Sequence, residues 1–182
     1  MLGSVSRCLL FLCLACFGLT AVAQSRTTVP VRTLPPGLGE VTRRAGLIFA
    51  GRVVKIEPVR VADADHVASV RITLQVEQGV RGARAGQTLA FREWAGLWTG
   101  EERYRLGQRL MLFLYAPSSL GLTSPVGGAA GKFALDRDGK IVLTEAQLQA
   151  IRISPNPLRI NIGRRIPLRD FSRAIRRMRG EE

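Results

Sequence analysis

Cysteine and histidine are scarce in this chain, and their scarcity limits its chemistry. The 182 residues include three cysteines, all within the first sixteen positions, and one histidine, His66. Beyond residue 16 the chain therefore cannot form disulfides, thiolate metal sites or cysteine nucleophiles. A serine hydrolase triad would have to be built around His66, and residues 121–125 lack the G-x-S-x-G nucleophile elbow. These absences favour a binding protein over an enzyme.

The N-terminus has the three parts of a cleavable signal peptide. Arg7 gives a basic start, residues 8–19 are apolar, and residues 21–23 (AVA) match the small-x-small pattern of a cleavage site. The apolar run is shorter than the ~20 residues of a membrane-spanning helix. Lipidation at Cys16 is the weaker alternative. A lipobox has a large aliphatic residue three positions before its cysteine, and this chain has Cys13 there. We therefore expect an exported, periplasmic or extracellular protein that is cleaved near Ala23 and Gln24.

Acidic residues are outnumbered almost two to one by basic ones. The chain has 27 Lys and Arg residues against 14 Asp and Glu, for a net charge of +13, and only Lys55, Lys132 and Lys140 are lysines. A field of this sign favours acidic partners: anionic lipid headgroups, an acidic polysaccharide or an acidic protein face. Nucleic acid is not expected as the partner of an exported protein.

The central part of the chain has the residue patterns of β-strands. Apolar and polar side chains alternate over residues 67–76, which predicts a strand with one buried face. Residues 109–115 (RLMLFLY) are apolar from position 110 onward, which predicts a strand buried on both faces. Gly51, inside another apolar run, predicts a bulge. Other strands are expected over residues 47–56, 87–94, 132–135 and 140–143, with hairpin turns at 62–65 and 136–139.

Helical patterns flank these strands. Three apolar residues at helical spacing between positions 38 and 45 predict a short helix, and the proline-containing residues 24–37 before it predict an extended arm. Residues 144–147 (TEAQ) match a capping box that begins a second helix. The last predicted helix carries an apolar stripe on a basic background. The stripe consists of Leu168, Phe171, Ile175 and Met178.

Together these elements predict a mainly β fold. We expect a small, closed or nearly closed OB-like barrel of five to six strands, with a short N-terminal helix and a C-terminal amphipathic helix. The expected organisation is a signal peptide over residues 1–23, an extended arm over 24–37, the barrel domain over 38–163, and a basic helix and tail over 164–182.

Three segments resemble netrin-like domains, the family that includes the tissue inhibitors of metalloproteinases. Residues 45–54 (AGLIFAGRVV) are similar to the family's A-D-V-V-F-x-G-x-V opening, residues 70–82 (VRITLQVEQGVRG) to its F-x-V-x-x-x-x-K-G segment, and residues 107–114 (GQRLMLFL) to its G-x-x-Y-L-L-F strand. The resemblance covers about residues 40 to 115 and implies an OB-like barrel. The inhibitors chelate the zinc of their target through an N-terminal cysteine. The predicted mature chain has no cysteine, so that mechanism does not carry over.

The best candidate contact surface is a loop rich in aromatic and basic residues. Its members are of the types that anchor protein interfaces. They are Trp94, Trp98, Arg103, Tyr104 and Arg105. The alternative is that the two indoles close an open end of the barrel as part of its core.

A second candidate surface is the basic C-terminal segment. Its last helix either lies on an anionic lipid surface, with the apolar stripe toward the acyl chains, or docks on the barrel through that stripe, and docking is favoured. The basic residues of this surface are Arg164, Arg165, Arg169, Arg173, Arg176 and Arg177.

Catalytic and metal-binding interpretations have less support. Glu93, Glu101 and Glu102 lie among the aromatic residues of the loop and would supply the carboxylates of a carbohydrate-acting enzyme. Residues 63–66 (DADH) lack a second cluster of metal ligands, and the glycine-rich residues 118–131 lack the context of a phosphate-binding loop. No catalytic residue, metal or cofactor is therefore expected.

The sequence thus predicts an exported, non-catalytic binding module that contacts an acidic or protein partner through the aromatic and basic loop. A protease-inhibitor-like or protease-associated module is the first alternative, by resemblance, and a carbohydrate-acting enzyme is the second.

Overall fold

The computed structural model describes residues 36–60, 67–97, 103–153 and 163–180. The predicted signal peptide, nearly all of the predicted arm and the predicted hairpin loop at 62–65 lie outside these residues.

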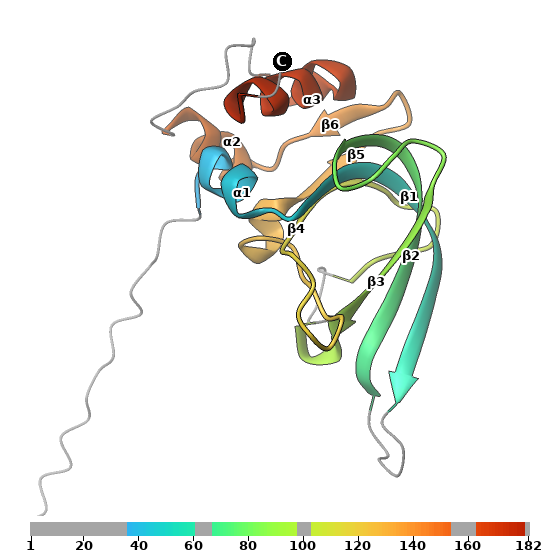
Figure 1. The fold of residues 1–182 in the computed structure, drawn as a ribbon. Helices are drawn as coiled ribbons and strands as arrows, with labels where there is room; N and C mark the ends of the chain where they lie inside the picture. Colours follow the sequence, from blue (N-terminus) through green and yellow to red (C-terminus); the bar gives the residue numbers. More distant parts are fainter. Residues whose placement is uncertain (1–35, 61–66, 98–102, 154–162, 181–182) are drawn as a thin grey trace, which may run out of the picture. The chain divides into compact units, whose positions relative to one another are not determined.

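Seven strands of the described residues form a single antiparallel sheet (Figure 1), in the order β3-β2-β1-β4-β5-β6-β7. The strands are β1 (Leu47–Arg60), β2 (Val67–Arg81), β3 (Thr88–Trp94), β4 (Arg109–Leu114), β5 (Lys132–Leu135), β6 (Lys140–Val142) and β7 (Arg165–Pro167). The fold is therefore mainly β, as the sequence predicts.

The sheet is open, which corrects the prediction of a closed barrel of five to six strands. Among the described strands, β3 and β7 form the two edges. β4 pairs with β1 on one side and with β5 on the other, so it does not close the sheet onto β3. β7 lies in the segment that the sequence assigns to the helical tail, and it extends the sheet beyond β6.

One loop segment lies between β3 and β4 without forming a strand. Arg92 of β3 makes a parallel bridge with Leu122, and Leu114 of β4 makes an antiparallel bridge with Pro125. The amide of Thr123 also donates to the carbonyl of Arg92 at 2.8 Å. Residues 122–125 thereby connect two strands that do not pair with each other.

The glycine inside β1 coincides with a register shift, as predicted. The pairing of β1 with β2 shifts between Ala50 and Gly51, where the sequence predicts a bulge. A Cβ atom at residue 51 would lie 2.6 Å from the carbonyl oxygen of Gln75 in β2. Only glycine therefore lets the two backbones approach this closely at the bulge.

Two clusters of buried residues lie on the two faces of the sheet. Side chains of β4 alternate between them: Met111 and Phe113 join one cluster, and Leu110, Leu112 and Leu114 join the other. The prediction that residues 109–115 form a strand buried on both faces is confirmed. The alternating residues of β2 (Val70, Ile72, Leu74 and Val76) all belong to the second cluster, again as predicted.

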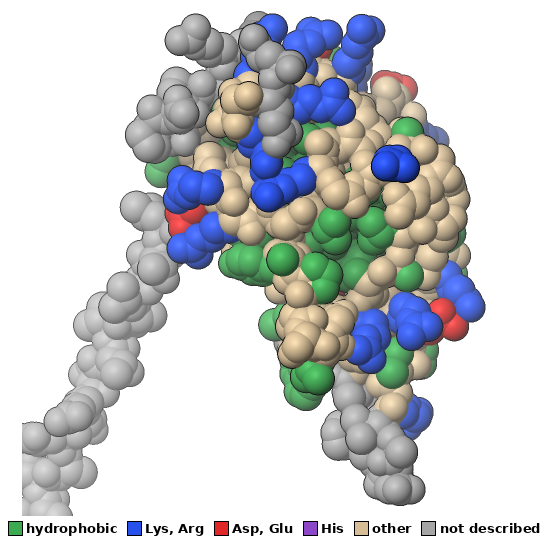
Figure 2. Space-filling view, viewed as in Figure 1, with side chains coloured by type: hydrophobic (Ala, Val, Ile, Leu, Met, Phe, Trp, Pro, Cys, Tyr) green, Lys and Arg blue, Asp and Glu red, His purple; other side chains and the backbone are tan. Residues whose placement is uncertain are grey.

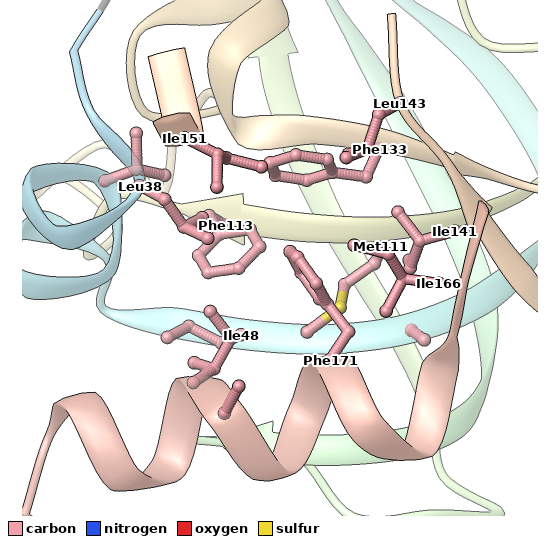
Figure 3. Packing of buried hydrophobic residues seen from close by; sticks show 14 of the residues in the cluster. Leu38, Ile48, Met111, Phe113, Phe133, Ile141, Leu143, Ile151, Ile166 and Phe171 are labelled. Atoms are coloured by element: carbon pink, nitrogen blue, oxygen red, sulfur yellow. The ribbon is translucent and has the colours of Figure 1, made fainter. Parts of the chain in front are cut away.

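Three α-helices cover the face of the first cluster (Figures 1 and 3). They are α1 (Leu38–Arg44), α2 (Glu145–Arg152) and α3 (Leu168–Met178). Leu38 of α1, Ile151 of α2 and Phe171 of α3 meet Ile48 and Phe113 of the sheet in this cluster (Figure 3). The N-terminal, capping-box and C-terminal helices predicted from the sequence are thus confirmed. Within the described residues, none of the helices has the length and apolar character needed to cross a membrane.

Candidate functional site

The loop predicted as a contact surface begins at the end of edge strand β3. Trp94 is the last residue of β3, and a short 3-10 turn, η1 (Ala95–Leu97), follows it. The Trp94 side chain is 55% exposed and that of Leu97 is 49% exposed. A Cβ atom at Gly96 would lie 2.7 Å from the indole nitrogen of Trp94, so the indole lies against the backbone of the turn. Trp94 is therefore both exposed and held in place.

The other aromatic residue of the loop that the structure describes lies inside the protein. Tyr104 is only 4% exposed and belongs to the second core cluster. Its ring packs edge-on against Phe91, with centroids 5.9 Å apart, and the ammonium of Lys132 lies 3.9 Å from its ring centroid. Tyr104 thus supports the loop from beneath and does not lie on its outer surface.

Two of the remaining predicted members of the loop are exposed, and the others lie outside the described residues. Arg103 and Arg105, on either side of Tyr104, are exposed to solvent. Trp98, Glu101 and Glu102 lie outside the described residues. Of the predicted members that the structure describes, Trp94, Arg103 and Arg105 therefore lie on the surface, and Tyr104 is buried.

A cavity of about 640 Å³ lies beneath this loop. Its lining comes from β3, β4, β5, the loop after β4 and the start of α2. Leu97 and Tyr104 contribute from the candidate loop, while Glu93 of β3, Lys132 of β5 and Tyr115, directly after β4, form other parts of the lining. Cavities of roughly 300–1,000 Å³ with mainly apolar walls and a few polar groups are typical of ligand sites.

Glu93 is the buried carboxylate of this cavity. It lies on the inner face of β3 and is only 5% exposed. The sequence places it on one face with Leu89 and Phe91 by alternation, and the structure bears this out, because Phe91 belongs to the second cluster and Leu89 packs against it. A carboxylate at such a depth needs polar or charged neighbours.

One wall of the cavity is fixed by Gln147 of α2. Its side-chain amide donates to the carbonyls of Ala129 and Lys132, each at 3.0 Å. Its carbonyl oxygen accepts from the amide of Thr144 at 3.1 Å, which completes the predicted capping box. The wall is therefore preformed. The capping pattern predicts the helix end but not this second role, because Ala129 and Lys132 are remote in sequence.

The predicted basic surface is exposed, but several of its arginines have partners. Arg164 pairs with Glu145 at 3.5 Å, Arg165 with Asp136 at 3.9 Å, and Arg173 with Asp170 at 3.5 Å. Arg176 donates to the carbonyl of Gly79 at 2.8 Å. Arg169 and Arg177 are exposed on α3. The apolar stripe of α3 packs into the first cluster, so the docking alternative holds for this helix.

The described residues contain no group of three or more His, Cys, Asp or Glu side chains that could hold a metal ion. Asp136 has a structural role instead: one carboxylate oxygen accepts from the amides of Asp138 and Lys140, as in an ordinary hairpin turn. The predicted turn at residues 136–139 is thus confirmed, while Asp63, Asp65 and His66 lie outside the described residues.

A scan against models of protein families finds no match to this chain, and no curated protein is significantly similar to it. The resemblance to netrin-like domains therefore stays a prediction.

Proposed function

We propose that this protein is an exported, non-catalytic binding module whose partner contacts the loop of residues 94–105. The observation that carries the proposal is the half-exposed indole of Trp94, packed on the backbone at Gly96. Tryptophan is the residue type most often found at the energetic centre of an interface, and a fixed side chain loses little conformational entropy on binding.

The cavity beneath the loop supports the same proposal. Leu97 is both exposed and part of the cavity lining, so the loop surface is continuous with the cavity. A partner side chain that enters beside Leu97 would meet the apolar walls first and Glu93 and Lys132 as polar groups. Interfaces commonly bury one such side chain in a pocket of the other protein.

We also propose that β1 to β4 correspond to the OB-like barrel implied by the resemblance, in a form that is not closed by strands. β1 pairs with both β2 and β4, and residues 122–125 bridge β3 in parallel and β4 in antiparallel orientation. Under this proposal residues 122–125 take the place of a closing strand. Strands β5 to β7 and helix α3 are then additions to the OB-like part.

The proposal is tested by capture of the partner from the exported fraction of the cells that make the protein. Trp94→Ala and Trp98→Ala are compared with Ile153→Ala, a control at an exposed apolar residue in the C-cap of α2. We expect one protein to be retained at high salt and lost with Trp94→Ala but kept with Ile153→Ala. Loss of an interface anchor typically weakens binding by about thirtyfold, or about 2 kcal/mol.

Intrinsic fluorescence gives a second readout, because both tryptophans of the chain, Trp94 and Trp98, lie in the proposed loop. A bound partner should shift their emission. Binding of anionic material alone, released by salt and unaffected by either tryptophan substitution, would contradict the proposal.

A carbohydrate-acting enzyme is the second candidate, favoured by one observation, the position of Glu93 in the same cavity as Tyr104. It predicts hydrolysis of an oligosaccharide that Glu93→Gln abolishes while thermal unfolding stays unchanged. Equal inactivity of both proteins on a panel of polysaccharides would exclude this role for Glu93.

A further inference from the structure

We propose that the outer faces of α1 and α3 form a docking surface for the phosphates of an anionic lipid bilayer, and that this surface binds by charge without inserting. The surface is distinct from the loop of residues 94–105, and the two can be tested separately.

The apolar sides of both helices are committed to the core. Leu38 and Val41 of α1 and Phe171 and Ile175 of α3 are buried in the same cluster against the sheet. Phe171 points from α3 into this cluster (Figure 3). Insertion into acyl chains would require these side chains to leave the core, so the helices cannot bind a membrane as inserted amphipathic helices do.

The opposite sides of the two helices carry an excess of positive charge. Figure 2 shows Lys and Arg side chains gathered where α1 and α3 lie. Glu40 pairs with Arg44 at 3.0 Å, and Asp170 pairs with Arg173. The remaining exposed arginines of α1 and α3 have no carboxylate partner within the described part of the chain. They are Arg43, Arg169, Arg176 and Arg177.

The chemistry of these side chains points to phosphate. All the cations of α1 and α3 are arginines, and a guanidinium matches a phosphate with two parallel hydrogen bonds. The charges are spread over two neighbouring helices, and the lining of the cavity beneath the loop of residues 94–105 comes from other elements. A layer of charge of this kind suits an extended anionic surface. The proposed export would bring the protein to such a surface, that of a lipid bilayer.

The effect of each arginine sets the expected size of the result. An arginine near an anionic bilayer raises partition roughly fivefold, which corresponds to about 1 kcal/mol. Removal of three such charges should therefore weaken binding roughly a hundredfold. Because the interaction is between exposed charges, salt at about 0.5 M should release the protein by screening.

The test is sedimentation of the exported protein with vesicles of phosphatidylglycerol and phosphatidylcholine in equal parts, against vesicles of phosphatidylcholine alone. The triple variant Arg43→Gln, Arg169→Gln and Arg177→Gln removes charges from both helices. The matched control, Arg52→Gln, Arg71→Gln and Arg137→Gln, removes three exposed charges from the sheet and its β5–β6 turn. Circular dichroism and thermal unfolding verify that both variants fold.

We expect binding only to the anionic vesicles, roughly hundredfold weaker binding by the helix variant, and a change below about threefold for the control. Tryptophan emission should not change on vesicle binding, and Trp94→Ala should bind vesicles normally even if it loses its protein partner. Equal losses in the two triple variants, or binding to phosphatidylcholine alone, would overturn the proposal. So would binding to soluble polyphosphate without binding to vesicles.

Discussion

The guanidinium of Arg109 in β4 holds the carboxylate of Glu77 in β2 across the intervening strand β1. Its Nε donates to the two carboxylate oxygens at 2.9 and 3.1 Å, and Nη2 donates to one of them at 2.5 Å. Nη1 donates to the carbonyls of Asp136 and Arg137 in the β5–β6 turn. One side chain of β4 thereby holds both β2, which lies two strands away, and the turn that follows the neighbouring strand β5.

We predict that Arg109→Ala lowers the free energy of unfolding by about 1–3 kcal/mol, because it leaves a partly buried carboxylate with fewer partners. Arg52, whose Nε lies 3.9 Å from Glu77, limits the loss. Urea unfolding measures it. Arg137→Ala is the control, since only the backbone carbonyl of Arg137 is used, and it should change stability by less than about 0.5 kcal/mol. An equal loss in both variants would contradict the structural role of Arg109.

The pKa of Arg109 determines the pH range in which this contact contributes to stability. Hydrogen bonding to Glu77 is the main cause that raises the pKa of Arg109 in the folded protein. A raised folded-state pKa means that this contribution is fully present below the ordinary pKa of arginine and is lost as the pH rises through the higher pKa of the folded protein. Titration of Arg109 should therefore add no pH dependence of stability at neutral or moderately alkaline pH.

Two glycines should respond to alanine in opposite directions. Gly51→Ala places a Cβ atom 2.6 Å from the carbonyl oxygen of Gln75 and should cost about 1–3 kcal/mol through displacement of the β1–β2 pairing. Gly39 lies in α1 with no atom within 4 Å of a Cβ, so Gly39→Ala should stabilise the protein by about 0.5–1 kcal/mol. Thermal unfolding of the two variants measures both effects, and destabilisation by Gly39→Ala would contradict the open space expected around a side chain at this position.

Two buried hydroxyls should be dispensable. The side-chain oxygens of Thr42 in α1 and Ser172 in α3 are buried without a hydrogen-bond partner among the described residues. Replacement of an unsatisfied buried polar group by an apolar one of similar size removes its desolvation cost. We expect Ser172→Ala to raise the free energy of unfolding by about 0.5–1 kcal/mol and Thr42→Val to be neutral or stabilising. A loss above about 1 kcal/mol in denaturant unfolding would reveal a partner for the hydroxyl.

The capping box of α2 should behave as a coupled pair. Thr144→Ala removes the acceptor for the amide of Gln147 and should cost about 1 kcal/mol. Gln147→Ala should cost more, because it also frees the carbonyls of Ala129 and Lys132 in the cavity wall. The double variant should lose less than the sum of the two single losses, since they share one hydrogen-bonded unit. Strict additivity in a double-mutant cycle would contradict that coupling.

The predictions from sequence succeed where the determining pattern is local. Two of these patterns, the alternation in β2 and the apolar run of β4, depend on neighbouring strand positions. The capping box at residues 144–147 lies within one helical turn, and the apolar stripe of α3 lies within three. β2, β4 and α3 are present in the structure with the buried side chains that were predicted, and the capping box of α2 is present as well.

The features that sequence reasoning missed depend on residues far apart along the chain. Arg109 and Glu77 are 32 positions apart, and Lys132 of β5 contacts Tyr104 of the loop before β4. No alternation marks Tyr104 as buried, because the residues beside it belong to a loop. β7 is only three residues long, too short for a periodic pattern to appear. The cavity, and with it the second role of Gln147, emerges only when these segments are brought together.

The position of β4 between two clusters of buried residues has a consequence for how the chain folds. Its pairing with β1 runs from Leu47 with Leu114, 67 positions apart, to Arg52 with Arg109, 57 positions apart, and neither cluster is complete without its side chains. We expect slow folding in one cooperative step, as is usual when pairing is so non-local. Neither cluster can be completed during synthesis until β4 has left the ribosome, and the helix-covered one must also await Phe171 and Ile175. Such late completion would suit the export that we propose, because a chain that has not yet folded can pass through a translocation channel.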